Sequence, residues 1–399
     1  METTASVAGR AMPAAADVLP KSTTRLLFVD NIRVFLTILV LLHHLMITYA
    51  GTGSWYYTEG KEDFATGALG AWFQGTNQAY FMGLFLLISA YFVPGSYDRK
   101  GAAHFFKDRL IRLGIPLILY SWIVRPVLIY LDPINGAGAS LAFPDFIGKY
   151  FAQSSLIGAG PLWFIETLLI FSLVYVLWRL ARPGRPAEPA AETPFPSNGV
   201  IAIFALLVGL AAFVIRLWLP VMWNFVPLNL QFPFFAQYIA LFIVGLVAYR
   251  RNWLMRLPET TGRLWLRIGV LMILLFWPLM IGGGAGSGDL TPYFGGWHWQ
   301  ALAYALWESF VCVGMCIGLV YAFRQFADRQ GTIAKFLSPN AYTAYLIHGP
   351  IIVAVAYAAR SIEVYPLLKW VLVALVAVPL CFVLSNLIRK LPYTQRVLG

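Results

Sequence analysis

The sequence predicts an all-α integral membrane protein whose chain crosses the bilayer about ten times. Of the 399 residues, 59% are hydrophobic and only 12% are charged, which is half of the ~25% usual in soluble domains. Three stretches without Asp, Glu, Lys or Arg, at 34–58, 64–97 and 336–359, are longer than the about 20 residues needed to cross the hydrocarbon core. The composition excludes a soluble globule, and 16% aromatic residues exclude a disordered chain.

Ten apolar segments are expected to be the membrane-spanning helices. Pro and Gly residues separate them, as at Pro94-Gly95 and Pro183-Gly184. The expected ranges are about 29–50, 73–94, 113–131, 161–179, 199–219, 232–249, 265–281, 301–323, 341–359 and 366–388. We expect residues 1–26 to be a disordered cytoplasmic tail and residues 27–392 to form one membrane domain, with a Pro/Ala-rich cytoplasmic linker at 182–198.

Positive charge alternates along the connecting segments. Twenty-two of the 29 Lys and Arg residues fall in every second segment, beginning with the N-terminal tail, whereas the other segments hold only Lys61, Lys149, Arg360 and Lys369. Because cytoplasmic loops of membrane proteins carry an excess of Lys and Arg, this pattern predicts that both termini are cytoplasmic. The net charge of +11 then lies on the inner face, where anionic lipids or a phosphorylated substrate explain it without nucleic acid.

Few ionisable residues fall within the predicted spans, and each is a functional candidate because burying it in lipid is costly. They are Arg33, His43, His44, Arg125, Glu166, Arg216, Glu308 and His348. Arg216 and Glu308 lie near the outer ends of their helices, where we expect structural, snorkelling roles. Arg125 and Glu166 lie at similar depths and are expected to form a buried ion pair.

The first predicted helix places a cation and an imidazole on one face. Arg33 and His44 are eleven positions apart, so about 20° separates them around the helix axis and about 16 Å along it. His43 points about 80° away from that face. The arrangement suits a long substrate with an anionic head and a distant reactive end, although a histidine that only bonds a neighbouring helix would look the same.

The sequence also resembles a known family. Arg33 and His44 match the R-x10-H signature in the first helix of the membrane-bound acyltransferase-3 family. Four segments are similar to its other motifs, in the same order: GLFLLISAYF at 83–92, RLIRLGIP at 109–116, GPLWFI at 160–165 and YTAYLIHGP at 342–350. Ala90 stands where the family usually has Gly. The resemblance covers nearly the whole chain from Leu27 onward.

The resemblance implies a multi-pass protein of the cell membrane, in bacteria the inner membrane. It implies transfer of an acyl group, commonly acetyl, from a cytoplasmic acyl-CoA to a hydroxyl of a carbohydrate or lipid-linked glycan. Acyl-CoA is then the donor substrate, and no bound cofactor is expected. The chemistry fits the residues, because an attacking alcohol must lose its proton and histidine is suited to take it.

Several residues have predicted roles in this reaction. His44 is the predicted general base, oriented by Glu166 or by a backbone carbonyl, and His348 is either a second catalytic group or a packing imidazole before the Pro350 kink. Arg33, Arg109 and Arg112 are expected to bind the phosphates of the donor, since the guanidinium fork matches phosphate oxygens. Alternatively, Arg33 only pairs with Asp30 and snorkels. Ser89 and Trp163 are candidate substrate-binding residues, or a helix contact and an interface anchor.

Two other functions fit the same composition. A secondary transporter also has about ten helices with sparse buried charges, but the first and second five spans show no internal repeat. A non-catalytic scaffold or sensor would need a soluble signalling domain, for which the chain has no candidate. The three cysteines, Cys312, Cys316 and Cys381, lie in apolar runs and are expected to pack between helices, with no disulfide and no metal.

Overall fold

The computed structural model describes residues 25–60, 63–132, 141–153, 158–182, 194–226 and 228–398. Within these ranges the chain is α-helical without a β-strand; a single antiparallel bridge joins Phe225 and Leu230. The predicted tail and most of the predicted linker at 182–198 lie outside the described residues. The predicted all-α class is confirmed.

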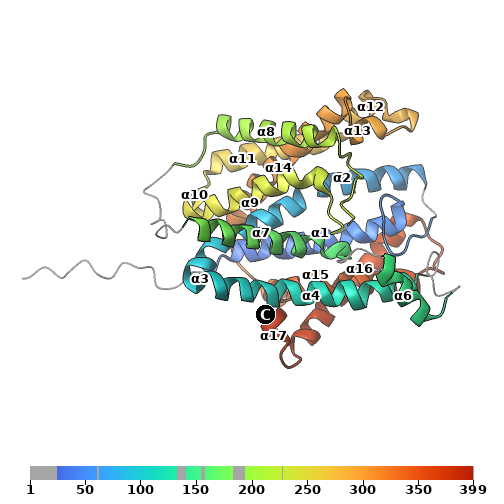
Figure 1. Cartoon of the computed structure of the whole chain (residues 1–399). Helices are drawn as coiled ribbons and strands as arrows, with labels where there is room; N and C mark the ends of the chain where they lie inside the picture. Colours follow the sequence, from blue (N-terminus) through green and yellow to red (C-terminus); the bar gives the residue numbers. More distant parts are fainter. Residues whose placement is uncertain are drawn as a thin grey trace, which may run out of the picture.

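The helices run roughly parallel or antiparallel to one another in a bundle (Figure 1). They are α1 (Leu27–Ala50), α2 (Phe64–Tyr91), α3 (Val93–Arg109), α4 (Ile115–Leu119), α5 (Arg125–Tyr130), α6 (Phe143–Gln153), α7 (Trp163–Ala181), α8 (Asn198–Arg216), α9 (Phe235–Arg250), α10 (Trp253–Arg256), α11 (Glu259–Leu274), α12 (Phe276–Gly282), α13 (Thr291–Phe294), α14 (Trp299–Phe326), α15 (Thr332–Ala358), α16 (Pro366–Arg389) and α17 (Thr394–Leu398). Short π-helical turns join α3, α4 and α5 into one helical segment, Val93–Tyr130.

Nine helical segments of the described chain are long and apolar enough to cross a membrane. They correspond to nine of the ten predicted spans. The remaining prediction, 73–94, falls on α2, which has 28 residues but is not one of the nine. Its N-terminal half carries Gln74, Thr76, Asn77 and Gln78, which lower its hydropathy. Because α1, α9 and α14 pack around α2, it has little contact with lipid and tolerates these polar side chains.

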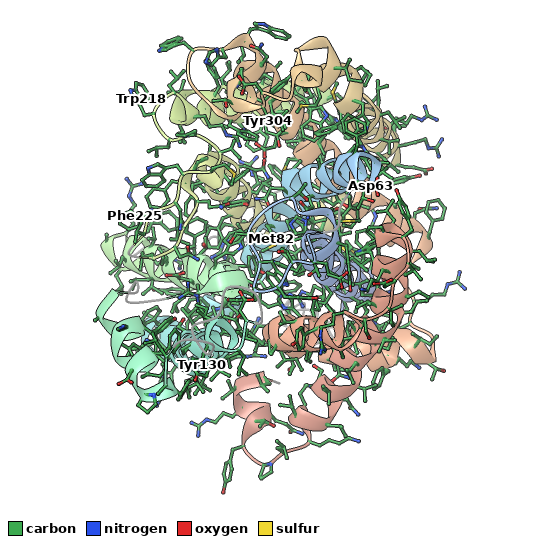
Figure 2. The ribbon with its side chains drawn as sticks, turned by 90° about the vertical axis from the view of Figure 1, so that its right-hand side faces the viewer. Asp63, Met82, Tyr130, Trp218, Phe225 and Tyr304 are labelled. Carbon is green, nitrogen blue, oxygen red and sulfur yellow. The ribbon has the colours of Figure 1, made fainter. Side chains whose placement is uncertain are left out.

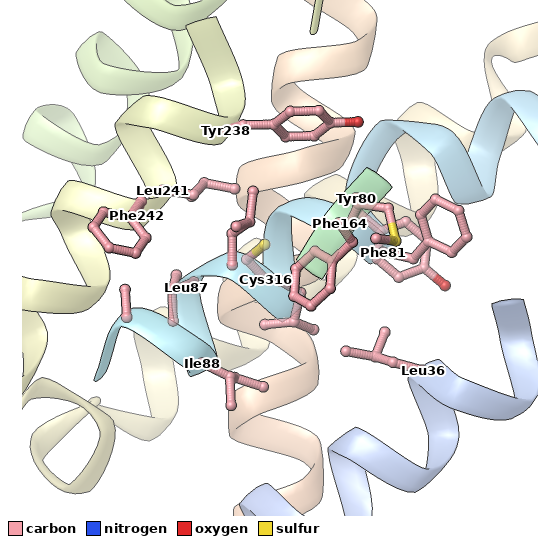
Figure 3. Close-up of a cluster of buried hydrophobic side chains, with 14 of the residues drawn as sticks. Leu36, Tyr80, Phe81, Leu87, Ile88, Phe164, Tyr238, Leu241, Phe242 and Cys316 are labelled. Carbon is pink, nitrogen blue, oxygen red and sulfur yellow. The ribbon is translucent and has the colours of Figure 1, made fainter. Parts of the chain in front are cut away.

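The largest apolar core surrounds α2. Leu87 and Ile88 of α2 lie among side chains from α1, α7, α9 and α14, including Leu36, Phe164 and Cys316 (Figure 3). Gly245 of α9 permits the close approach to α2, since an added Cβ there would clash with the carbonyl oxygen of Leu87. The core fixes α1 and α7 relative to each other, and these two helices carry several of the predicted site residues.

The outer helices present apolar side chains to the surroundings. Leu206 and Leu207 of α8 and Leu375 and Val376 of α16 are exposed. Such surfaces are expected where helices contact lipid. In the end-on view, Trp218 and Tyr304 lie in the upper part of the bundle and Tyr130 in the lower part (Figure 2). The α8/α14 side and the α5 side are therefore on opposite flanks.

The segments predicted to be cytoplasmic meet at one end of the bundle. Arg25, Arg99, Arg112 and Asn252 line one cavity there, although they come from separate segments. At the other end, the predicted outer residue Lys369 pairs with Glu59 at 2.7 Å. The alternation of loops is thus reproduced in space. Which end faces the cytoplasm stays a prediction from the charge pattern.

Candidate active site

A large cavity opens at the basic end of the bundle. Its volume is about 950 Å³. The cationic side chains that line it are Arg25, Arg33, Arg99, Lys100, Arg109 and Arg112, and the acidic ones are Asp30 and Asp108. The deeper walls are mainly apolar and come from α2, α7 and α15, with Phe85, Phe164, Ile165, Leu168, Ala341 and Tyr345. The cavity is therefore cationic at its mouth and apolar inside.

The structure brings the three predicted donor-binding arginines to this cavity. Arg33 of α1 lies 3.5 Å from Asp30 in an ion pair and stacks its guanidinium over the Phe92 ring at 4.9 Å. Within the described residues Arg109 and Arg112 form no direct ion pair, although Asp108 lines the same cavity. Ser89, a candidate substrate-binding residue, also lines the cavity, and its role stays a prediction.

The face of α1 that carries Arg33 continues past the cavity to His44. Thr37 lines the cavity one turn beyond Arg33, and His44 lies two further turns along the same face, about 10 Å deeper. The Nδ1 atom of His44 lies 2.9 Å from the carbonyl oxygen of Val40. That contact makes Nδ1 the donor and leaves Nε2 with its lone pair. Of the two predicted orienting groups, the backbone carbonyl is the one in contact.

His348 of α15 lies beside His44. The ring centroids of the two imidazoles are 4.9 Å apart. The Nδ1 atom of His348 contacts the Tyr345 carbonyl at 2.5 Å, and its Nε2 is buried without a hydrogen-bond partner. Tyr345 stacks on His348 at 5.7 Å and also lines the cavity. Tyr345 therefore connects the cavity to the imidazole pair.

The loop between α1 and α2 covers the imidazoles from the opposite end of the bundle. Trp55 of this loop lies 4.5 Å from the His44 ring and stacks over His348 at 6.2 Å. The adjacent Tyr56 accepts a hydrogen bond from the Tyr120 hydroxyl at 3.0 Å. Gly160, with φ +50°, lets its segment pass so close to Tyr56 and Tyr120 that a Cβ there would clash.

Trp55 and Tyr56 were not among the residues predicted from the sequence. Both lie outside helices, so no helical spacing relates them to His44. The only signal was the aromatic run Trp55-Tyr56-Tyr57 eleven residues after His44.

Two other predicted site residues lie elsewhere. Glu166 of α7 is buried, and among the described residues neither carboxylate oxygen has a hydrogen-bond partner, His44 included. Trp163 stacks on Tyr238 of α9 at 5.3 Å and makes no ring contact with the imidazoles. The roles assigned to both residues stay predictions.

Two predictions about buried charges are wrong. Arg125 and Glu166 do not form an ion pair, because Arg125 donates to the Tyr150 hydroxyl at 2.8 Å and Glu166 is unpartnered. Arg216 and Glu308 do not snorkel: both are fully buried and bond each other at 2.5 Å. Equal depth alone does not determine which helices are neighbours.

The chain is similar to known proteins over most of its length. The model of a family described as "Acyltransferase domain" matches residues 26–386. The chain is 23% identical over 349 residues to proteins named glucans biosynthesis protein C from several Escherichia coli strains, among them K12 and O9:H4 strain HS, with 83% of each chain covered. No solved structure matches the chain significantly. Because the family model spans most of the sequence, the chain belongs to the acyltransferase-3 family of membrane acyltransferases.

Proposed function

We propose that this protein transfers an acyl group, in the simplest case acetyl, from acyl-CoA to a hydroxyl group of a carbohydrate or lipid-linked glycan. The name of the similar Escherichia coli proteins makes a glucan the first acceptor to test. The bacterial inner membrane is the proposed location. The observation that carries the proposal is the continuous series Tyr345, His348, His44 and Trp55, which joins a basic cavity to the opposite end of the bundle.

The donor is proposed to occupy the cavity. The phosphates of CoA match a mouth lined by arginines, of which Arg33, Arg109 and Arg112 follow the family motifs. The apolar depth then receives the acyl arm. A volume of about 950 Å³ is at the upper end of the ~300–1,000 Å³ typical of small-molecule sites, as a donor of this size requires.

His44 is proposed to be the general base. Its Nδ1–H donates to Val40, so the Nε2 lone pair accepts the proton of the attacking hydroxyl. The alcohol oxygen forms a bond to the thioester carbonyl carbon, and the carbon–sulfur bond breaks. The imidazolium then returns the proton to the departing thiolate, so the products are an ester and free CoA.

The test uses purified protein, radiolabelled acetyl-CoA and a glucan preparation as acceptor. His44→Ala should reduce label transfer by about 10²–10⁴-fold, the range typical for loss of a general base. His43→Ala is the matched control, because His43 is adjacent on α1 and packs against Phe81 at 5.1 Å, with only an edge contact to the His44 ring at 5.5 Å. Undiminished transfer by His44→Ala, or equal losses from both variants, would contradict the assignment.

A further inference from the structure

The indole of Trp55 carries a buried hydrogen-bond donor that the protein itself leaves unused. Its Nε1 is buried and has no hydrogen-bond partner among the described residues. Burying a donor without a partner destabilises the folded chain, and a bound substrate can supply the missing acceptor. Trp55 also makes ring contacts with both imidazoles of the candidate site, which places its indole beside the proposed reaction centre.

Acyl transfer needs a hydrogen-bond donor for the thioester oxygen, and His44 and His348 do not supply one. His44 and His348 both direct Nδ1 to backbone carbonyls, so their remaining Nε2 atoms are acceptors in the neutral rings. These two Nε2 acceptors can receive the proton of an attacking hydroxyl group. They do not stabilise the negative charge that forms on the thioester oxygen, which requires an N–H or O–H group.

We propose that the Trp55 indole N–H donates to the acyl carbonyl oxygen and stabilises the oxyanion of the tetrahedral intermediate. The inference rests on the proposed function. As the hydroxyl oxygen adds to the carbonyl carbon, the carbonyl π electrons move to the oxygen that faces Trp55, and His44 holds the transferred proton. When the intermediate collapses, the carbon–sulfur bond breaks, the proton passes to the thiolate and Trp55 is unchanged.

The loop around Trp55 is fixed at several points, as a preorganised donor requires. Glu59 donates its backbone N–H to the Thr48 carbonyl at 3.0 Å, and its carboxylate forms a buried ion pair with Lys369 at 2.7 Å. Tyr56 is bonded to Tyr120, and the indole itself packs on His44. The donor is therefore held before substrate arrives.

The test replaces Trp55 with β-(3-benzothienyl)alanine, in which sulfur takes the place of the indole N–H and the ring size is kept. Wild-type and substituted proteins are assayed with radiolabelled acetyl-CoA and a linear glucan oligosaccharide. We expect kcat to fall by about 10²–10³-fold, with the KM for acetyl-CoA nearly unchanged, because an oxyanion donor acts mainly in the transition state. Trp55→Phe should show the same pattern if the analogue is poorly incorporated.

The same replacement at Trp253 is the matched control. The Trp253 Nε1 is also buried without a partner, but Trp253 lies on α10 at the basic end and makes no ring contact with the imidazoles. The replacement at Trp253 should leave kcat unchanged. A kcat for the Trp55 analogue equal to that of wild type overturns the oxyanion role while the proposed function stands. If the wild-type chain transfers no label, both fail together.

Discussion

Two buried polar clusters of this bundle differ in whether they contain a pair of opposite charges. In the first, between α8 and α14, Arg216 and Glu308 bond each other at 2.5 Å, and Arg216 also donates to the Pro233 carbonyl. In the second, between α1 and α15, His44 and His348 bond only the carbonyls of their own helices. The first cluster compensates two opposite charges, although Arg216 Nη1 and Glu308 Oε1 find no further hydrogen-bond partner among the described residues. The second cluster has no such ion pair and leaves His348 Nε2 and the Trp55 indole N–H without a partner among those residues.

The two clusters also differ in their surroundings, because only the second is next to the basic cavity. Phe234 and Tyr304 rings lie against the Arg216 guanidinium at 5.1 and 5.8 Å, and no residue of the pair lines the basic cavity. His348 instead stacks on Tyr345, which does line it. A charged pair enclosed by aromatic rings has a structural role, whereas unpaired neutral groups next to a cavity indicate a substrate-binding site. Mutations should separate the two by their effects on stability and on activity.

Breaking the enclosed pair should have the largest effect on stability. Glu308→Leu leaves Arg216 buried without its carboxylate, which typically costs about 3–5 kcal/mol. This loss of stability is measured as a fall in the melting temperature in detergent. The readout is the fraction of protein that remains monodisperse after heating. The double variant Arg216→Met/Glu308→Leu should recover most of the loss, because an apolar pair of similar volume needs no charge compensation. A double variant as unstable as Glu308→Leu would contradict this view of the pair.

His348→Ala should show the opposite pattern. Removing an imidazole with an unused Nε2 should change the melting temperature little beyond the cost of lost packing. Acyl transfer should fall by about 10-fold or more, because a polar group beside the proposed base helps position the hydroxyl. His348→Gln keeps a polar side chain and should retain more activity than His348→Ala. A variant that loses stability but keeps its kcat would place His348 with the structural residues.

The sequence predicted the α-helical class and most spans because apolar runs are local features. It also predicted the face shared by Arg33 and His44, since one helix fixes both positions. It could not predict that His44 contacts His348, because that contact depends on how α1 packs against α15. The Arg125–Glu166 prediction failed for the same reason: depth in the membrane follows from the sequence, but the neighbour of a helix face does not. Judged by depth alone, an Arg216–Glu308 pair was as plausible as an Arg125–Glu166 pair.

Trp55 shows a second limit of sequence reasoning. The orientation of a loop side chain follows from tertiary anchors, here the Glu59–Lys369 pair and the Tyr56–Tyr120 hydrogen bond. These anchors join segments that are distant in sequence. No periodicity relates them, so only the folded chain identifies the indole as part of the site.

The smallest effect on activity is expected from substitutions at the mouth of the cavity, where the charged side chains are hydrated. Arg33 is 39% exposed and already pairs with Asp30, so two roles compete: binding donor phosphates, or anchoring the helix end. If Arg33 binds phosphate through its planar fork, Arg33→Lys should raise the KM for acetyl-CoA several-fold and leave kcat unchanged, since lysine keeps the charge but loses the bidentate geometry. Added salt should raise the KM of the wild type through screening.

Asp30→Asn decides between the two roles of Arg33. Asp30 holds both Arg25, at 2.5 Å, and Arg33. If Arg33 binds the donor, removing the carboxylate charge takes away an anion that repels phosphate, so the KM for acetyl-CoA should stay equal or fall. If Arg33 is only an anchor, Arg33→Lys should be nearly silent and Asp30→Asn should reproduce the effect of Arg33→Ala. The proposed role of the cavity requires the first result, because a donor phosphate and Asp30 compete for the same guanidinium.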